Sequence, residues 1–349
     1  MILFRVDGNK TTGAGHVMRC LSIADHAGSC GVECVFLMAS DDMEKNIIGH
    51  GHRTVIFHTE YENMLSDLHL TQEWIENMQP VSLIVDSYYV TGGYLSSLKQ
   101  CCMKSGTTLV YVDDLMAFPY PCDILLNYNI YGPDKRTEYF RMYQDAHMPE
   151  LLLGPAYAPL RHEFRNPGKR EVKRTARNIL VSTGGADFGH IGVAFIKAVI
   201  RHEEELKDLQ FHFVIGSMNG DAGLIRRMAE GVSSIRLHFN VQEMSELMGS
   251  CDVAISAAGS TLYELCATQT PTVTYILADN QIPGAEGFER HGIMKCVGDV
   301  RQVGVDELVD TFIKESMLLV NDYEKRRRMA EKQRNLVDGE GACRLLEKI

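Results

Sequence analysis

Residues 2–16 of the chain read ILFRVDGNKTTGAGH, and this stretch decides the fold. Its near-continuous apolar run, Ile2–Val6, predicts a strand that is buried on both faces of a parallel sheet. The glycines of Gly13-Ala14-Gly15-His16 then close a turn into a helix, because apolar side chains return at the spacing of a buried helix face, at Val17, Cys20, Leu21 and Ala24. Backbone N–H groups at such a helix start favour a bound anion.

The same alternation of short β-type runs and helix-type stretches continues along the chain. In the first half we expect strands at Ile2–Val6, Cys34–Met38, Val55–Phe57, Leu83–Val85, Leu109–Val112 and Ile124–Leu126. In the second half we expect them at Asn178–Ser182, Phe211–Ile215, Ile235–Phe239, Val253–Ser256 and Thr272–Ile276. Strands that alternate with helices indicate βαβ units, so the sequence predicts an α/β fold with two Rossmann-like domains facing across a cleft.

The length of 349 residues suits two domains. Residues 165–177 are polar and basic and include Pro167-Gly168, which is typical of an exposed linker; a nucleic-acid contact is the alternative interpretation of this charge. We therefore predict an N-terminal domain over residues 1–165 and a C-terminal domain over residues 166–349. The charged helix expected from Asp322 to about Val337 would pack across their junction.

The composition argues against several classes of protein. The formal net charge of -11 disfavours a nucleic-acid or anionic-membrane partner. The ten cysteines have no zinc-type spacing, which is typical of reduced, mostly buried thiols in a cytoplasmic protein. We find no signal peptide, no apolar run as long as a membrane span needs and no His/Asp/Glu cluster with metal-ligand spacing. The expected partner is a small molecule, with no metal or cofactor and with the oligomeric state left open.

His16 is the candidate catalytic residue of the first half. Ligands of open α/β sheets bind beyond the carboxyl ends of the strands, where this loop is expected to lie. Imidazole changes its protonation near neutral pH and can therefore accept a proton. A histidine that only caps the helix or packs locally is the alternative. Asp7, at the end of the first strand, would orient His16 or bind a ligand hydroxyl.

Two loops of the second half also follow a predicted strand and lead into a predicted helix. Gly184-Gly185-Ala186-Asp187 follows a predicted strand, although a tight turn without a ligand has the same pattern. Ser260 and Thr261 follow another strand, and their hydroxyls could hold a diphosphate. Glu264 could accept hydrogen bonds from both hydroxyls of a ribose, but Thr261 and Glu264 also match a T-x-x-E capping box. The sequence leaves these alternatives open.

Further polar side chains follow strands of the first half. Asp86 ends a predicted strand and precedes Ser87 and Tyr88, and Asp113 and Asp114 end the next strand. All of them could line the predicted cleft beside His16. Each carboxylate could equally cap a helix or a turn.

These motifs together resemble those of the UDP-2,4-diacetamido-2,4,6-trideoxy-β-L-altropyranose hydrolases of pseudaminic acid biosynthesis. The resemblance begins at Arg5-Val6-Asp7 and Gly13 to Arg19, continues through Asp86-Ser87-Tyr88, Asp113-Asp114, Asp123 to Asn127, Gly154 to Arg161 and Gly184 to Asp187, and covers Ser256 to about Gly292. The second half is also similar to the lipid II-forming N-acetylglucosaminyltransferase of peptidoglycan synthesis. Both families share the GT-B arrangement of two Rossmann-like domains.

The resemblance implies a role for each candidate residue. His16 would be the catalytic base, and the sugar side would be bound by Arg5, Asp7, Gly15, Asp86, Tyr88 and Asp113. In the second half Glu264 would take the ribose of UDP, Ser260 and Thr261 the diphosphate, and Val241 the uracil. Gly185 would also contact UDP, and Asn280 and Gln281 would lie near the sugar or phosphate.

The implied reaction is hydrolysis of a UDP-activated 2,4-diacetamido-2,4,6-trideoxy sugar to free sugar and UDP with inversion, for nonulosonic (pseudaminic) acid or surface polysaccharide biosynthesis. UDP is already a good leaving group, so the remaining task is to place and activate one water. A GT-B glycosyltransferase with a UDP-sugar donor is the alternative, and residues 131–147 could then form a lipid-facing patch. A sugar-nucleotide-binding protein without turnover is the third hypothesis.

Overall fold

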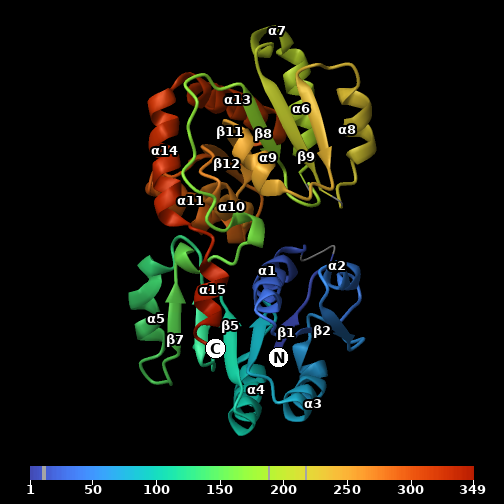
Figure 1. Cartoon of the computed structure of the whole chain (residues 1–349), viewed down its shortest axis with the longest axis vertical. Helices are drawn as coiled ribbons and strands as arrows, with labels where there is room; N and C mark the ends of the chain where they lie inside the picture. The colour runs from blue at the N-terminus through green and yellow to red at the C-terminus, as the bar shows by residue number, and fades with distance from the viewer. Residues whose placement is uncertain (10–12, 188, 217) are drawn as a thin grey trace. The chain divides into compact units, whose positions relative to one another are not determined.

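The computed structural model describes residues 1–9, 13–187, 189–216 and 218–349. The described chain divides into two compact units, one made of Met1–His162 with Gly339–Ile349 and the other of Glu163–Asp338 (Figure 1). Each unit contains one parallel β-sheet with helices connecting its strands. The predicted α/β class is therefore confirmed for both halves of the chain.

The sheet of the first unit has seven parallel strands in the order β3-β2-β1-β4-β5-β6-β7. Its central strands are buried along their whole length because their runs are apolar, as the sequence predicted. Val6 pairs with Asp86, so the carboxyl ends of β1 and β4 lie beside each other. The strands are β1 (Ile2–Val6), β2 (Cys34–Met38), β3 (Arg53–Ile56), β4 (Ser82–Asp86), β5 (Thr108–Val112), β6 (Ile124–Asn127) and β7 (Glu150–Leu153).

Helix α1 (Gly15–Ser29) covers the start of this sheet and buries the predicted face, Val17, Cys20, Leu21 and Ala24. Leu95 and Leu98 of α4 (Gly92–Ser105) are likewise fully buried in the core of this unit, which they share with residues such as Leu83. The other helices of this unit are α2 (Glu44–Gly49), α3 (Leu68–Met78) and α5 (Arg136–Met142), with short 3-10 turns at Met64–Asp67, Pro133–Lys135 and Pro155–Tyr157. A further 3-10 turn, His162–Phe164, spans the division between the two units in the sequence.

The end of the chain belongs to the first unit, which differs from our predicted division at residue 165/166. Helix α15 (Gly341–Leu346) packs against α1 and against the turn at Pro155–Tyr157. Gly341 allows this close approach, since an added Cβ atom would lie 2.2 Å from the carbonyl oxygen of Ala158. Arg344 also donates a 2.7 Å hydrogen bond to the carbonyl oxygen of Ala156.

The second unit has six parallel strands in the order β10-β9-β8-β11-β12-β13. They are β8 (Asn178–Ser182), β9 (Gln210–Ile215), β10 (Ile235–Phe239), β11 (Val253–Ala257), β12 (Thr272–Ile276) and β13 (Lys295–Asp299). The helices are α6 (Ile191–Arg201), α7 (Glu203–Leu206), α8 (Ala222–Ala229), α9 (Met244–Ser250), α10 (Thr261–Ala267), α11 (Ile282–Arg290), α12 (Val300–Val303), α13 (Val305–Asn321) and α14 (Tyr323–Leu336), with a 3-10 turn at Asp279–Gln281.

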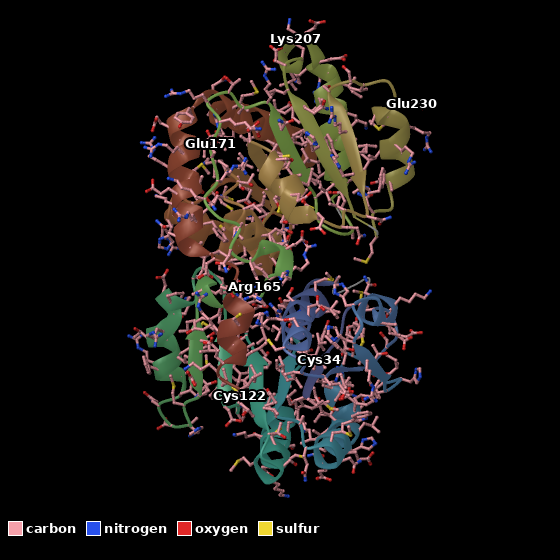
Figure 2. All side chains as sticks on the ribbon, viewed as in Figure 1. Cys34, Cys122, Arg165, Glu171, Lys207 and Glu230 are labelled. Atoms are coloured by element: carbon pink, nitrogen blue, oxygen red, sulfur yellow. The ribbon has the colours of Figure 1, made fainter. Side chains whose placement is uncertain are left out.

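The charged helix predicted from Asp322 is α14, which packs against α10 and α13 of the second unit. Its buried residues, Arg326, Met329, Ala330 and Gln333, follow the spacing of one helix face. The guanidinium of Arg326 donates hydrogen bonds of 2.6–2.9 Å to the carbonyl oxygens of Leu319, Val320, Lys173 and Arg174. The predicted linker is largely exposed at residues 166–169 but is anchored to the second unit by such bonds; Figure 2 labels Arg165 and Glu171 within it.

The sequence missed strands β7 and β13, which both lie at the edge of a sheet. Both are only partly buried, with buried residues at Leu152 and Leu153 of β7 and at Asp299 of β13. β13 reads Lys-Cys-Val-Gly-Asp, and its pairing with β12 is irregular between Thr274 and Ile276. Over the described ranges, no helix combines the length and apolar character that crossing a membrane requires.

Candidate functional site

The strand order of the first unit creates a reversal point between β1 and β4. From β1 the chain builds outward through β2 to β3 and then returns to β4 on the other side of β1. Loops that leave the sheet on the two sides of such a point diverge and leave room for a ligand. Here those loops begin at Asp7 and Asp86, and the first leads into α1 with His16 in its first turn.

His16 pairs with Asp86 at this point. Its Nδ1 atom lies 2.6 Å from Oδ1 of Asp86, whose side chain is fully buried, and the His16 side chain is only 9% exposed. The helix cap precedes His16, at Ala14, and makes no side-chain hydrogen bond, so His16 is not a capping residue. A carboxylate facing Nδ1 favours the proton on Nδ1 and leaves the lone pair on Nε2. Within the described residues no hydrogen-bonding group pairs with Nε2.

Arg19 lies one helical turn after His16 and also contacts Asp86. Its Nε and Nη2 atoms each lie 2.5 Å from an oxygen of Asp86, which forms a two-pronged contact. Its Nη1 atom donates to Oδ2 of Asp114 at 2.8 Å and to the hydroxyl of Tyr128 at 3.1 Å. Burial alone would raise the pKa of Asp86, but the Arg19 guanidinium and the His16 ring bring that pKa well below its usual range.

Tyr88 borders the same cluster. Its ring meets the ring of His16 edge-on, with centroids 4.4 Å apart, and its hydroxyl donates to Asp114 at 3.2 Å. The structure therefore brings together four residues that the sequence placed at this site, His16, Asp86, Tyr88 and Asp114. It adds Arg19, for which spacing gave no separate role.

Asp7 does not orient His16. One oxygen of Asp7 pairs with Arg5, and the other accepts a 2.7 Å hydrogen bond from the backbone N–H of Ala39. Arg5 is fully buried and also donates to Asp67 at 2.6 Å. Opposing carboxylates hold the pKa of the Arg5 guanidinium above its usual range although burial would lower it. The group that orients His16, which the sequence left open between Asp7 and another residue, is Asp86.

Asp113 closes a turn instead of lining the site. Its Oδ1 atom accepts hydrogen bonds from the backbone N–H groups of Leu115 and Met116, at 2.8 and 3.0 Å, and Oδ2 accepts from Tyr139 at 2.6 Å. The residue is fully buried, and this burial raises its pKa. The alternative that the sequence left open for this carboxylate, a turn cap, therefore describes the contacts of Asp113.

The second sheet has its own reversal point, between β8 and β11. The Gly184-Gly185 loop leaves β8, and the Ser256–Glu264 loop begins at the end of β11, so the two flank this point. Gly185 is exposed, and the backbone of Gly216 passes so close that a Cβ there would lie 2.2 Å from the carbonyl oxygen of Gly185. Asp187 accepts hydrogen bonds from the backbone N–H groups of Ile191 and Gly192 and thereby caps α6.

The capping box that the sequence allowed at Thr261 is out of register. The cap of α10 is Ser260, in a helical backbone conformation and without a side-chain capping bond, so Thr261 and Glu264 occupy the first and fourth helical positions. Ser260 is exposed, and Thr261 and Glu264 are half-buried. These side chains therefore lie beyond the carboxyl end of β11 without the arrangement of a capping box.

The remaining candidates of the second unit follow two other strands. Val241 comes two residues after the end of β10 and is half-buried. Asn280 is exposed in the turn after β12, and Gln281 accepts a 2.8 Å hydrogen bond at Oε1 from the backbone N–H of Leu277, which closes that turn. All the predicted residues of this unit thus lie at the carboxyl edge of one sheet.

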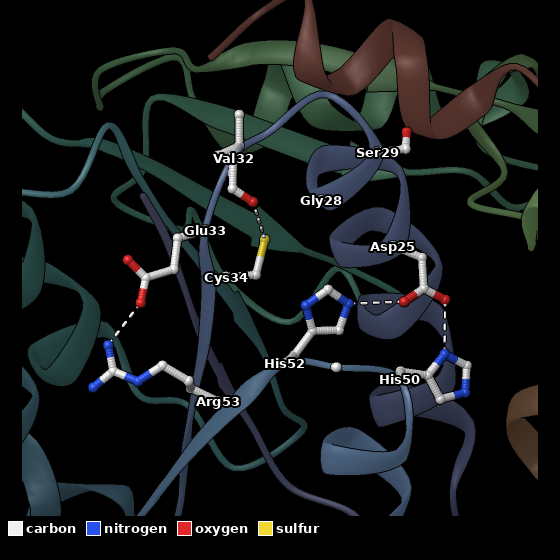
Figure 3. A pocket seen from close by; sticks show the side chains of 10 residues that line it. Asp25, Gly28, Ser29, Val32, Glu33, Cys34, His50, His52 and Arg53 are labelled. Atoms are coloured by element: carbon white, nitrogen blue, oxygen red, sulfur yellow. Dashed lines mark hydrogen bonds and ion pairs between the residues drawn. The ribbon is translucent and has the colours of Figure 1, made fainter.

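The first unit also has a pocket of about 450 Å³ at the opposite edge of its sheet (Figure 3). It lies at the amino ends of β2 and β3, where Asp25 accepts hydrogen bonds of 2.8 Å from both His50 and His52. None of the predicted site residues lines this pocket. Across the described part of the chain, no cluster of three or more His, Cys, Asp or Glu side chains has a geometry that could hold a metal ion.

Comparison with known proteins identifies relatives that align with three quarters or more of the chain. No family model matches it. It is 26% identical over 294 residues to the uncharacterized protein MJ1062 of Methanocaldococcus jannaschii, covering 79% of this chain but only 55%, about half, of that protein. It is 24% identical over 348 residues to the spore coat polysaccharide biosynthesis protein SpsG of Bacillus subtilis, covering 97% of this chain and 94% of SpsG.

The predicted family resemblance is confirmed. The chain is 24% identical over 266 residues to the UDP-2,4-diacetamido-2,4,6-trideoxy-beta-L-altropyranose hydrolase of Campylobacter jejuni, covering 75% of this chain and 86% of that enzyme. Its fold matches the crystal structure of Acinetobacter baumannii MurG with a TM-score of 0.69 and 13% identity, over 100% of this chain and 98% of MurG. The chain is therefore related to these hydrolases and has the GT-B type of fold.

Proposed function

We propose that this protein is an enzyme that hydrolyses a UDP-activated 2,4-diacetamido-2,4,6-trideoxy sugar to UDP and the free sugar, with inversion at the anomeric carbon. One observation carries the proposal: Nδ1 of His16 lies 2.6 Å from a buried Asp86 carboxylate, at the reversal point of the first sheet. The name of the Campylobacter jejuni relative supplies the substrate and the reaction. The name of SpsG, a spore coat polysaccharide biosynthesis protein, supports a role in polysaccharide synthesis.

The chemistry starts from a neutral His16 ring with its proton on Nδ1. Nε2 takes a proton from a water molecule as the water oxygen bonds to the anomeric carbon. The bond from that carbon to the diphosphate oxygen breaks on the opposite face, which inverts the configuration. Asp86 stabilises the positive ring that forms, because the carboxylate accepts the Nδ1–H bond throughout.

The remaining candidate residues of the first unit are of two kinds: those assigned to contact the sugar and those assigned to support the site. Asp7 and Tyr88 lie at the ends of β1 and β4 and are assigned to the sugar, as is Gly15, where an added Cβ would meet no described atom within 4 Å. Arg5 and Asp113 are assigned a supporting role, since both are completely buried and bonded to protein groups.

The nucleotide is assigned to the second unit. Glu264 would accept the two ribose hydroxyls, and Ser260 and Thr261 would bond the diphosphate. Their position at the carboxyl edge of β11 supports this assignment. Gly185 would let the backbone approach UDP closely, Val241 would contact the uracil, and Asn280 and Gln281 would lie near the sugar or phosphate.

A glycosyltransferase is the second candidate, because the structure resembles MurG over its full length. In that case His16 would take its proton from an acceptor hydroxyl instead of water. The two candidates differ in whether UDP is released when no acceptor is present.

The test is UDP release from the UDP-linked 2,4-diacetamido-2,4,6-trideoxy-altrose, with no acceptor added, by wild type and by His16→Ala. We expect UDP and free sugar from the wild type and a loss of about 10²-fold or more in the variant. UDP binding without release would contradict hydrolysis and favour the transferase.

A further inference from the structure

We propose that Arg19 is a positioning residue for the His16–Asp86 pair and that Asp114 holds Arg19 in place. This inference rests on the proposed role of His16 as the base. Arg19 would act through Asp86, by fixing the plane of its carboxylate and keeping it ionised. Its own atoms would not touch the reacting groups.

The contact between Arg19 and Asp86 fixes both carboxylate oxygens. Nε donates to Oδ2 and Nη2 donates to Oδ1, each at 2.5 Å, so the two planar groups meet along two parallel bonds. A bond pair of this kind restrains orientation far more than a single ammonium contact. With both oxygens fixed, Oδ1 is held 2.6 Å from Nδ1 of His16.

The proton position on His16 depends on the charge of Asp86. Nη2 of Arg19 also lies 3.0 Å from Nδ1, but when Nδ1 is protonated both nitrogens carry hydrogens, so the acceptor for Nδ1–H is the Asp86 carboxylate. Facing an ionised Asp86, Nδ1 carries the proton and Nε2 has the lone pair that a base needs. If Asp86 were protonated, it would donate to Nδ1, the ring proton would move to Nε2, and the base would be lost. The guanidinium beside Asp86 opposes that protonation.

Arg19 is itself held by groups from two further strands. Nη1 donates to Asp114, which follows β5, and to the hydroxyl of Tyr128, which follows β6. The Asp114 side chain is 11% exposed and also accepts from Asn129 at 2.8 Å. One buried guanidinium therefore serves two carboxylates, and its removal would leave both without their cationic partner.

Charged and titratable groups from several elements surround His16. They are Asp86 at the end of β4, Tyr88 after β4, Asp114 after β5, Tyr128 after β6, and Arg19 and Cys20 on α1. Arg19 is the cation of this set besides a protonated His16. Its loss should therefore favour the protonated imidazole and move the acid limb of the kcat/KM profile to higher pH.

The experiment compares Arg19→Met and Arg19→Lys with a matched control, Arg326→Lys. Arg326 is a buried arginine of the second unit that bonds only backbone carbonyl oxygens among the contacts described for its guanidinium. The readouts are the ¹⁵N signals of the His16 ring across pH, assigned by difference with His16→Gln, and the pH profile of kcat/KM. The ring signals report tautomer and protonation directly, so they remain informative if the proposed reaction is wrong.

We expect the wild type to show one neutral tautomer with the proton on Nδ1. Arg19→Met should lose that single tautomer or titrate at higher pH, with kcat/KM lowered by about 10- to 10²-fold and KM little changed. Arg326→Lys should match the wild type in both readouts. An Arg19→Met ring with the same tautomer and the same titration midpoint would overturn the proposal, whatever its activity.

Arg19→Lys covers the case in which Arg19→Met does not fold. Lysine keeps the charge but cannot form two parallel bonds to Asp86. We expect about a 10-fold lower kcat/KM with little shift of the acid limb. Wild-type kcat/KM in Arg19→Lys would show that the two-pronged contact is dispensable and would also overturn the proposal.

Discussion

The two sheets have the same strand order around their reversal points, but the residues at their carboxyl edges differ in charge and size. In the first unit the edge carries buried charges that bond one another, with Arg19 between Asp86 and Asp114 and Arg5 between Asp7 and Asp67. In the second unit the reversal point is flanked by glycine, alanine and hydroxyl residues, at Gly184-Gly185 and Ser256–Thr261.

This difference supports the division of labour that the proposed function assigns to the two units. A buried charge network restrains side chains to fixed orientations, which proton transfer requires. Small residues and hydroxyls expose backbone N–H groups and let a large polar ligand approach the chain. In the proposed function, one topology would supply a base in the first unit and a nucleotide site in the second.

The largest effect that this comparison predicts is on His16. His16→Ala should lower turnover by about 10²- to 10⁴-fold because it removes the general base, while UDP affinity stays unchanged. Steady-state rates and calorimetric UDP titration would measure the two quantities. Turnover near the wild-type value would remove His16 as the base, and lost UDP affinity would break the division between the units.

Asp86→Asn should have the next largest effect. An amide in place of the carboxylate can donate to Nδ1, which puts the ring proton on Nε2 and so removes the lone pair that the base needs there. We expect kcat to fall by about 10- to 10²-fold with little change in KM. Asp113→Asn is the matched control; it should lower thermal stability because Asp113 closes a turn, and a fall of kcat to the Asp86→Asn value would contradict this contrast.

Glu264→Ala tests the second unit. A charged group that accepts buried ribose hydroxyls contributes roughly 1.5–3 kcal/mol, so UDP affinity should fall by roughly 10- to 150-fold. The chemical step should change little when the variant is saturated with substrate. Glu243→Ala, on the loop before α9, provides a control carboxylate of the same unit. Equal UDP affinity in wild type and Glu264→Ala would refute the ribose assignment.

The smallest effect concerns a second histidine pair. Nδ1 of His212, on β9, lies 3.0 Å from Nε2 of His238, on β10. Burial, together with His238 and Arg236, lowers the pKa of His212 to about 4. The unfolded chain binds a proton here near pH 6.5, so the folded state should lose stability as the pH falls from about 6.5 to about 4.

The measurement for this pair is the difference in Tm between pH 7.5 and pH 5. His212→Gln should make the difference smaller than in the wild type, because the variant has no imidazole to protonate. His69→Gln, at an exposed position of the first unit, should leave it unchanged. If the Tm difference of His212→Gln equals that of the wild type, this histidine pair does not contribute to the pH dependence of stability.

Most of the fold could be predicted because the central strands consist mainly of apolar residues. Ile2–Val6, Cys34–Met38 and Asn178–Ser182 begin and end at the predicted residues. The edge strands Glu150–Leu153 and Lys295–Asp299 could not, since their pairing depends on a neighbouring strand more than on their own sequence. The return of residues 339–349 to the first unit is a tertiary contact and has no local signal.

The site could be predicted only where a local pattern marks it. The glycines before His16 and the strand that ends at Asp86 identified both residues, but their contact joins positions 70 apart in sequence. Arg19 has the appearance of an ordinary helix charge, so its contacts with two carboxylates were missed. Asp113 closes a turn because of the local backbone geometry, which the residue type alone does not specify.

The most direct test of the central claim is hydrolysis of the UDP-linked diacetamido-trideoxy-altrose in H₂¹⁸O, followed by NMR and by the mass of the released UDP. Attack of an activated water on the anomeric carbon predicts free sugar of inverted configuration that first appears with ¹⁸O, and UDP without it. UDP that carries ¹⁸O, or a first product of retained configuration, would contradict the mechanism proposed for His16 and Asp86.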